Sequence, residues 1–243
     1  MSDNLHFSNS LRRMLLNNRI AQILEILVVF LAALIIIRIA QPFVGDNPVL
    51  RQSIVWIANV IMLFLVWLGL KLRGQRWTHF GLSLKYLNLK SFLLSILVFV
   101  AALVGFLVGS IVIVNIVGIP ENADMSGYNY LQGNLPMLIA ALVAVFIVSS
   151  FGEEVIYRGF LITRISEMGG NSNRWIAASV FISSLIFGLA HFEWGLTGIV
   201  QTGFMGLALG ISFILVKRNL WILVLAHAYL DAILMIQMYF GGS

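Results

Sequence analysis

The sequence has no cysteine and only four prolines among its 243 residues. Without cysteine, the protein can have no disulfide bond, no iron–sulfur cluster, no thiolate zinc site and no cysteine nucleophile. Charged residues are also scarce, at 10% of the chain, whereas soluble globular proteins have about 25%. Hydrophobic residues make up 60% of the chain. We therefore expect a polytopic membrane protein folded as one compact domain.

The start of the sequence does not resemble a cleavable signal peptide. Residues 1–19 are polar and basic, and the apolar segment that follows is long enough to cross a membrane, unlike the short apolar region of a signal. The net charge of +5 does not predict a nucleic-acid partner, because basic residues in a membrane protein usually determine its topology. The lipid bilayer is the expected partner.

Seven apolar segments are long enough to span a bilayer, which predicts an all-α helix bundle. They cover residues 20–40, 53–70, 91–117, 136–163, 175–191, 197–216 and 220–240. Glu25 and Arg38 lie near the ends of the first span, where we expect their side chains to reach the interface. Glycines on one side of the sixth span predict close helix packing; they are Gly203, Gly206 and Gly210.

One short amphipathic helix is predicted between the second and third spans. Residues 71–90 have five basic side chains and no acidic one, and their apolar positions follow helical spacing. Those positions are Trp77, Phe80, Gly81, Leu84 and Leu87. A helix of this kind is expected to lie in the headgroup region.

We divide the chain into two parts. Residues 1–90 contain the basic N-terminal segment, two spans and the predicted interfacial helix, and residues 91–243 contain the remaining spans.

The distribution of basic residues predicts the orientation of the spans. Lysine and arginine gather in residues 1–19, 71–90, 164–174 and 217–218, whereas the alternate loops have almost none. The loop after the third span has Glu121 and Asp124 but no basic residue. Because basic loops stay in the cytoplasm, we expect the N-terminus inside, the C-terminus outside, and a location in a bacterial plasma membrane.

Two adjacent glutamates, Glu153 and Glu154, lie inside the fourth span. Ionisable residues at membrane depth are costly and are candidates for a functional site. Glu154 and Arg158 are four residues apart on a helix, so they are predicted to form an ion pair. Glu153 has no such partner, because position 157 is a tyrosine. One carboxylate can therefore be neutralised while the other remains available for chemistry, although a purely structural ion pair stays possible.

Two further spans carry polar residues of the kinds used in catalysis. His191 ends the fifth span, and His227 and Asp231 are four residues apart on one face of the seventh. A carboxylate at that spacing can fix the tautomer of a histidine or complete a set of metal ligands. Together with the glutamates, these side chains could activate a water molecule and stabilise an oxyanion.

Three motifs in this order resemble the CAAX-protease and bacteriocin-processing family of intramembrane endopeptidases. They are EExxxR at 153–158, FxxxH at 187–191 and HxxxN/D at 227–231. The resemblance covers about residues 136–235, and the FGL at 80–82 also resembles the segment that precedes the core of that family. It implies a bundle of eight or slightly fewer helices with a polar cavity that faces the cytoplasm.

The resemblance also implies roles for individual residues. Glu153 and His191 would activate the hydrolytic water, and Glu154 and Arg158 would support the site. His227 and the residue at position 231 would stabilise the tetrahedral oxyanion.

The resemblance leaves the roles of Asp231 and of a metal open. A metal-free glutamate mechanism needs no cofactor and is the one we favour. Where the family has asparagine, this chain has Asp231, which donates a hydrogen bond only when protonated. Asp231 could instead orient His227, or join His191 and His227 as a ligand of Zn²⁺.

The depth of His191 does not agree with that of the other residues. At about 1.5 Å per residue from the predicted cytoplasmic ends, Glu153 and His227 lie roughly 10–15 Å deep, but His191 lies at about 24 Å. Either the fifth span starts later than Trp175 or it is displaced along the bundle.

The sequence therefore predicts an intramembrane endopeptidase that cleaves a membrane-tethered peptide or protein. The alternatives are a proton-coupled transporter, because chains of acidic residues and histidines also relay protons, and a non-catalytic immunity or scaffold protein. The absence of an internal repeat argues against many secondary transporters. The presence of all three motifs argues against a degenerate site.

Overall fold

The computed structural model describes residues 2–45, 47–118 and 126–241, and within these residues every regular element is a helix. Within this described part of the chain, seven helical segments are long and apolar enough to span a membrane. They are α2 (Arg19–Val44), α3 (Pro48–Arg73), α4 (Leu89–Val117), the composite helix Leu135–Met168, α7 (Asn173–Ala190), Phe192–Leu215 and α9 (Leu220–Tyr239). The prediction of an all-α, multi-pass membrane protein is confirmed.

Asparagine side chains begin four of these helices. The side-chain oxygen of each accepts a hydrogen bond from a backbone N–H in the first turn, where no partner is available within the helix. The four caps are Asn18, Asn47, Asn88 and Asn134. Pro48 and Pro136 occupy the first turns of two of these helices, where a missing N–H costs little. These polar caps fix where each of the four helices begins.

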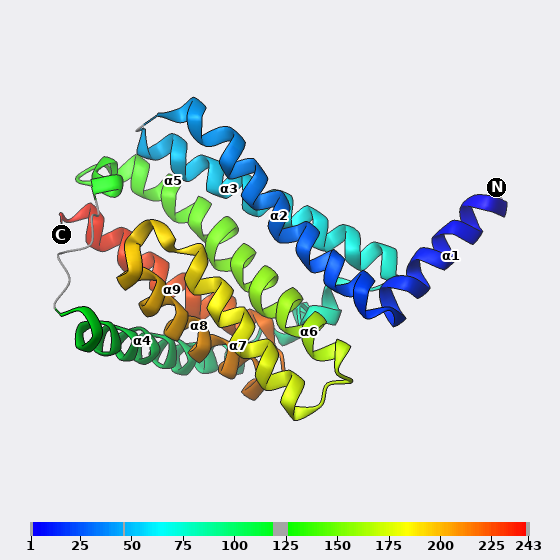
Figure 1. Ribbon diagram of the computed structural model, residues 1–243. Coiled ribbons are helices and arrows are strands. Elements are labelled where there is room, and N and C mark those ends of the chain that lie inside the picture. Colours follow the sequence, from blue (N-terminus) through cyan, green and yellow to red (C-terminus); the bar gives the residue numbers. More distant parts are fainter. Residues whose placement is uncertain (1, 46, 119–125, 242–243) are drawn as a thin grey trace.

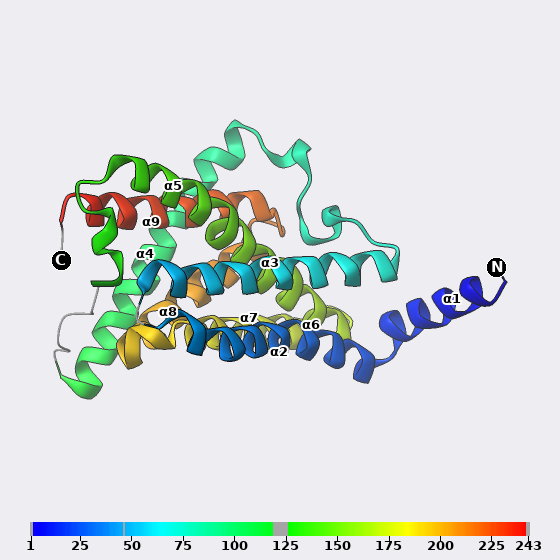
Figure 2. The ribbon, with the colours of Figure 1, turned by 90° about the horizontal axis from the view of Figure 1, so that it is seen from above.

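The spans form a bundle in which the fourth span lies between the α2–α3 hairpin and the helices α7 and α9 (Figure 1). The α2–α3 hairpin packs against the fourth span, and α4 packs against α8 (Gly195–Leu215) and α9 on the far side of the bundle (Figure 1). The N-terminal helix α1 (Ser2–Asn17) extends beyond one end of the bundle (Figure 2). The start of α2 and the end of α9 lie at opposite ends of the bundle, as an odd number of spans requires (Figure 1). The expected acidic loop residues Glu121 and Asp124 lie outside the described residues.

The fourth span is not a uniform α-helix. It begins as α5 (Leu135–Val145), continues through the π-helical segments η4 (Phe146–Phe151) and η5 (Glu154–Ile162), and ends as α6 (Thr163–Met168). π-Helical turns have i→i+5 hydrogen bonds, are rare, and occur frequently at functional sites. The two glutamates of the sequence motif lie at the junction of the two π-helical segments.

The prediction of a single amphipathic helix between the second and third spans is wrong. The chain forms two short 3-10 helices there, η1 (Trp77–Phe80) and η2 (Leu84–Tyr86). Gly74 and Gly81 have φ values of 68° and 83°, a left-handed conformation that interrupts a helix. Apolar spacing alone could not reveal these two breaks.

Phe80 and Gly81 fix this segment to the rest of the bundle. Phe80 is fully buried, and its side chain packs against the small surface of Gly159 in η5. A Cβ at Gly81 would lie 1.8 Å from the backbone oxygen of Arg218, so only glycine permits this approach. The FGL segment thus docks between η5 and the turn that precedes α9.

Glu25 forms a buried ion-pair cluster instead of reaching the interface as expected. Its carboxylate pairs with Arg73 of α3 and lies 3.7 Å from Nε of Arg164 in α6. Both arginine side chains are about 1% exposed, and Gly69 leaves room for the glutamate. Arg164 also pairs with Glu167 at 3.0 Å. The cluster joins the α2–α3 hairpin to the fourth span.

The small residues of α8 pack within the molecule. Gly203 approaches Gly188 of α7, and Gly206 and Gly210 contact Phe187 and Val180 of the same helix. The predicted close packing on this glycine face is confirmed. It brings the end of α7 against the centre of the bundle.

Candidate active site

Four of the predicted residues meet between the fourth span and α9. Glu153 and Glu154 come from the junction of η4 and η5, and His227 and Asp231 come from the middle of α9. His227 contacts all three carboxylates at 4.0 Å or less. The structure therefore brings these residues, 70 and more positions apart in the sequence, into one cluster.

Glu154 organises the buried side of the cluster through a single oxygen. Its Oε1 accepts hydrogen bonds from Arg158 Nη1 and from His227 Nδ1, both at 2.8 Å. The predicted ion pair of Glu154 and Arg158 is confirmed, and both side chains are fully buried. Because a carboxylate accepts at Nδ1, this nitrogen carries a proton and Nε2 faces the other two carboxylates. Glu154, not Asp231, holds the orientation of His227.

Arg158 is in turn held by its surroundings. Its Nη2 donates to the carbonyl of Gly206 at 3.4 Å, and its guanidinium lies 4.3 Å from the ring centre of Phe187. A cation over an aromatic face is stabilised by the electron density of the ring. Arg158 thus offsets the charge of Glu154 at a depth where water cannot do so.

Glu153 has a free oxygen that faces His227. Its Oε1 accepts a hydrogen bond from Ser149 Oγ at 3.3 Å, whereas its buried Oε2 has no hydrogen-bond partner among the described residues. Oε2 lies 4.0 Å from Nε2 of His227. That separation is too long for a direct hydrogen bond, so the two atoms face each other without one. Glu153 is the carboxylate that the ion pair leaves available.

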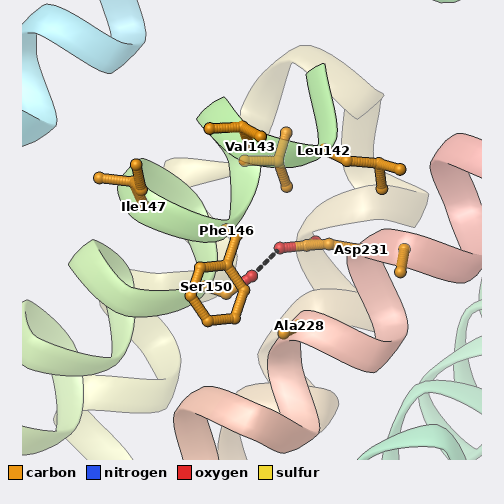
Figure 3. Close-up of a pocket in the computed structure, with 9 residues that line it drawn as sticks. Leu142, Val143, Phe146, Ile147, Ser150, Ala228 and Asp231 are labelled. Atoms are coloured by element: carbon orange, nitrogen blue, oxygen red, sulfur yellow. Dashed lines mark hydrogen bonds between the residues drawn. The ribbon is translucent and has the colours of Figure 1, made fainter. Parts of the chain in front are cut away.

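Asp231 lies next to the same nitrogen, at the wall of a cavity. Its Oδ1 is 3.8 Å from Nε2 of His227, too long for a direct hydrogen bond. Its Oδ2 accepts a hydrogen bond from Ser150 Oγ at 2.7 Å, which crosses from η4 to α9 (Figure 3). Nε2 of His227 is therefore flanked by Oε2 of Glu153 and Oδ1 of Asp231.

His191 lies at the end of α7 and reaches the cluster only through Phe187. The ring centre of Phe187 is 4.8 Å from that of His191 and 6.2 Å from that of His227. Nδ1 of His191 donates to the carbonyl of Phe187 at 2.8 Å, which leaves Nε2 as an acceptor. Within the described residues, no hydrogen bond links His191 to the four clustered side chains.

The mismatch in depth arises from displacement of α7 and not from a later start. α7 begins at Asn173, before the predicted start of the span. Phe187, about 21 Å along α7, contacts His227, about 10 Å along α9, at a rise of ~1.5 Å per residue. The two helices are therefore offset along the bundle.

The arrangement of these residues does not match a metal site. Among the described residues, no three histidine, aspartate or glutamate side chains are placed to hold one ion. His191 in particular is separated from His227 by Phe187. The zinc set of His191, His227 and Asp231 is thus not assembled in this structure, and we derive no step through a metal.

Tyr128, in η3 (Ser126–Leu131), is close enough to Asp231 and Glu153 to interact with their charges. Burial, with smaller contributions from Tyr130, Asp231 and Glu153, raises the pKa of Tyr128 to about 12. Its hydroxyl therefore keeps its proton at physiological pH and can only act as a hydrogen-bond group.

Ser149 and Ser150 were not among the predicted site residues. The spacing of four between Ser149 and Glu153 is a signal that could have identified the first. The bond from Ser150 to Asp231 joins two different spans, so nothing in the sequence indicates it. Serine is common in membrane helices, which made both residues inconspicuous.

Residues 135–233 match the family model of Rce1-like type II CAAX prenyl endopeptidases. No curated protein and no solved structure matches the chain. The matched residues contain the fourth span, α7, α8 and most of α9, and so all three sequence motifs. Over these residues the chain is similar to the CAAX-protease and bacteriocin-processing family of intramembrane endopeptidases.

Proposed function

We propose that this protein hydrolyses a peptide bond of a membrane-associated peptide or protein with a water molecule activated by Glu153. The observation that carries the proposal is the free Oε2 of Glu153, which lies 4.0 Å from an imidazole nitrogen oriented by a buried ion pair. A base must lie within hydrogen-bond reach of the water that it deprotonates, directly or through one water. The family match supports the general reaction.

In the first step, Glu153 takes a proton from the water while the water oxygen attacks the carbonyl carbon of the scissile amide. A carbon–oxygen bond forms, and the electrons of the carbonyl double bond move to its oxygen. His227, with protons on both ring nitrogens, donates from Nε2 to this oxyanion. Preorganised donors of this kind are often the largest contribution to catalysis.

In the second step, the oxyanion returns to a carbonyl and the carbon–nitrogen bond breaks. Protonated Glu153 gives its proton to the leaving amine, which restores the carboxylate. Glu154 and Arg158 keep His227 in place through both steps, and Asp231 stabilises its positive charge from 3.8 Å. Asp231 therefore acts on His227 and need not donate a hydrogen bond itself.

We extend the proposal to His191, whose Nε2 would accept a hydrogen bond from the attacking water. Its Nδ1 is already bound to a carbonyl, which fixes the tautomer that this role requires. We also propose that residues 136–235 form the protease core, that the protein lies in the plasma membrane, and that the site opens towards the cytoplasm.

The test is cleavage of a library of membrane-tethered reporter peptides by purified protein in liposomes. We expect wild type to cleave, and Glu153→Gln and His191→Ala each to lose about 10²–10⁴-fold in rate, the typical contribution of a general base. Each protein is assayed with and without a chelator. Loss of activity on chelation, restored by Zn²⁺, would replace this mechanism by a metal-dependent one, and full activity of Glu153→Gln would refute the role of Glu153.

A further inference from the structure

A cavity of about 550 Å³ lies beside the candidate active site, between the fourth span and α9. It is within the range of about 300–1,000 Å³ found for ligand pockets. Seven of its nine lining residues are apolar, and the other two are Ser150 and Asp231. Asp231 is the motif residue among those that line it.

The polar part of the cavity wall is shared with the active site. Figure 3 shows Ser150 and Asp231 joined by their hydrogen bond, with Phe146 and Ala228 close by. Asp231 is in turn 3.8 Å from the imidazole of His227. Anything that fills the cavity therefore lies directly beside the groups that act on the scissile bond.

The open side of the cavity faces away from the protein. Val143, Phe146 and Ile147 line it and are 57%, 45% and 55% exposed. These residues belong to a membrane span, so their exposed surfaces are in contact with lipid. An apolar segment held in the bilayer can reach the cavity from the side without crossing water.

The cavity extends from the active site towards the first turns of α5. Its residues on the fourth span precede Glu153 by three to eleven positions, and those on α9 follow His227. This direction leads away from the basic turns at 164–174 and 217–218, and so deeper into the bilayer. Substrate residues at this depth must be apolar.

We propose that this cavity binds the apolar side chains of the substrate on the membrane side of the scissile bond and selects large side chains over small ones there. The inference rests on the proposed endopeptidase function. A peptide fits both parts of the wall, because it has apolar side chains for the lining and amide groups for the polar edge. The cavity also adjoins the groups that act on the scissile bond, so the peptide that they cleave can occupy both places at once.

The test uses single-span reporter peptides that differ at one position on the membrane side of the scissile bond, with alanine, leucine or phenylalanine there. Cleavage is measured as kcat/KM in phosphatidylcholine vesicles. We expect wild type to prefer leucine to alanine by about tenfold or more, the usual discrimination of an apolar pocket. Ala232→Phe, which fills the cavity, should reduce the preference to less than about threefold, and Phe146→Ala should shift it towards phenylalanine.

Ile233→Phe is the matched control. Ile233 lies on the same helix, is 54% exposed and does not line the cavity, so the substitution should leave the preference unchanged. An unchanged preference in Ala232→Phe, in a protein that still cleaves, would overturn the pocket and leave the endopeptidase function intact.

Binding is measured separately in Glu153→Gln with a reporter that carries a photoreactive leucine analogue. We expect cross-links to residues 142–150 and 228–232 that excess unlabelled reporter removes. Cross-linking without cleavage by wild type would contradict the proposed reaction but support the pocket. Cross-linking elsewhere, or labelling of these residues only by a photoreactive phospholipid, would assign the cavity to lipid and refute the inference.

Discussion

Glu154 binds two donors through one oxygen, and this gives the two adjacent glutamates different functions. Arg158 and His227 both donate to it at 2.8 Å, whereas the hydrogen bond that Glu153 accepts within the described residues comes from Ser149 at 3.3 Å. Removing one partner of a buried ion pair leaves an uncompensated charge, which is costly in an apolar environment. The two residues should therefore respond differently to the same substitution.

We expect Glu154→Gln to lower the free energy of unfolding by about 3–5 kcal/mol, because Arg158 would keep its charge without a counter-ion. Thermal unfolding of the purified protein in detergent measures this loss. Glu153→Gln is the matched control and should change the stability by no more than about 1 kcal/mol while abolishing cleavage. Equal destabilisation by the two variants would contradict the division of roles.

Ser150 is the residue whose contribution the sequence did not suggest. We expect Ser150→Ala to reduce the rate of reporter cleavage by about tenfold, because a hydrogen bond to a charged group is worth about 1.5–3 kcal/mol. Ser150→Thr keeps the hydroxyl and should restore most of the rate. If Ser150→Ala lowers the melting temperature but not kcat, the serine has only a structural function.

At the scale of elements, the segment between α3 and α4 depends on one close backbone contact. A Cβ at Gly81 would meet the carbonyl oxygen of Arg218 at 1.8 Å, whereas Gly74 is also left-handed and its Cβ position has the end of the flexible Arg12 side chain as its nearest neighbour, at 3.0 Å. The strain of a left-handed alanine is thus common to both sites, and only the steric contact differs.

We expect Gly81→Ala to destabilise the protein by about 1–3 kcal/mol more than Gly74→Ala, the usual cost of overpacking. Melting temperatures of the two variants in the same detergent provide the comparison. Similar losses at both positions would show that backbone conformation, and not the contact with Arg218, accounts for the effect.

The helical spans could be predicted well because length and apolarity determine them directly. The observed helices begin and end within a few residues of the predicted limits, and the extra residues belong mostly to polar ends such as Lys71–Arg73. The π-helical segments could not be predicted, because a change from i→i+4 to i→i+5 hydrogen bonding leaves the composition of an apolar helix unaltered. The 3-10 helices were missed because Gly74 and Gly81 looked compatible with an amphipathic pattern.

Within the site, contacts inside one helix could be predicted from the sequence, whereas contacts between helices could not. The pair of Glu154 and Arg158 lies within one turn of one helix, so its spacing revealed it. The bond between Glu154 and His227 requires the packing of two spans, and the sequence indicated only that both residues are polar. The position of His191 depends on the offset of α7 along the bundle. Residue spacing within one helix does not predict such an offset.

At the scale of the whole molecule, seven spans and the distribution of basic residues together predict the orientation. We expect a reporter fused to the N-terminus to be active only in the cytoplasm and one fused to the C-terminus to be active only outside. Alkaline phosphatase and green fluorescent protein fusions distinguish the two sides. A reporter between residues 169 and 173 should be cytoplasmic, and its appearance outside would reverse the assignment.

The Glu25 cluster has a consequence for how the protein is made. α2 and α3 are synthesised before the fourth span, and Glu25 can pair with Arg73 as soon as these two helices form a hairpin. Arg164 arrives later, with Glu167 three residues further along its own helix, and it meets Glu25 only when the fourth span packs against the hairpin. The hairpin therefore acts as a template during biogenesis. The nascent fourth span should remain next to the translocon until Arg164 contacts Glu25 of the hairpin already in the membrane.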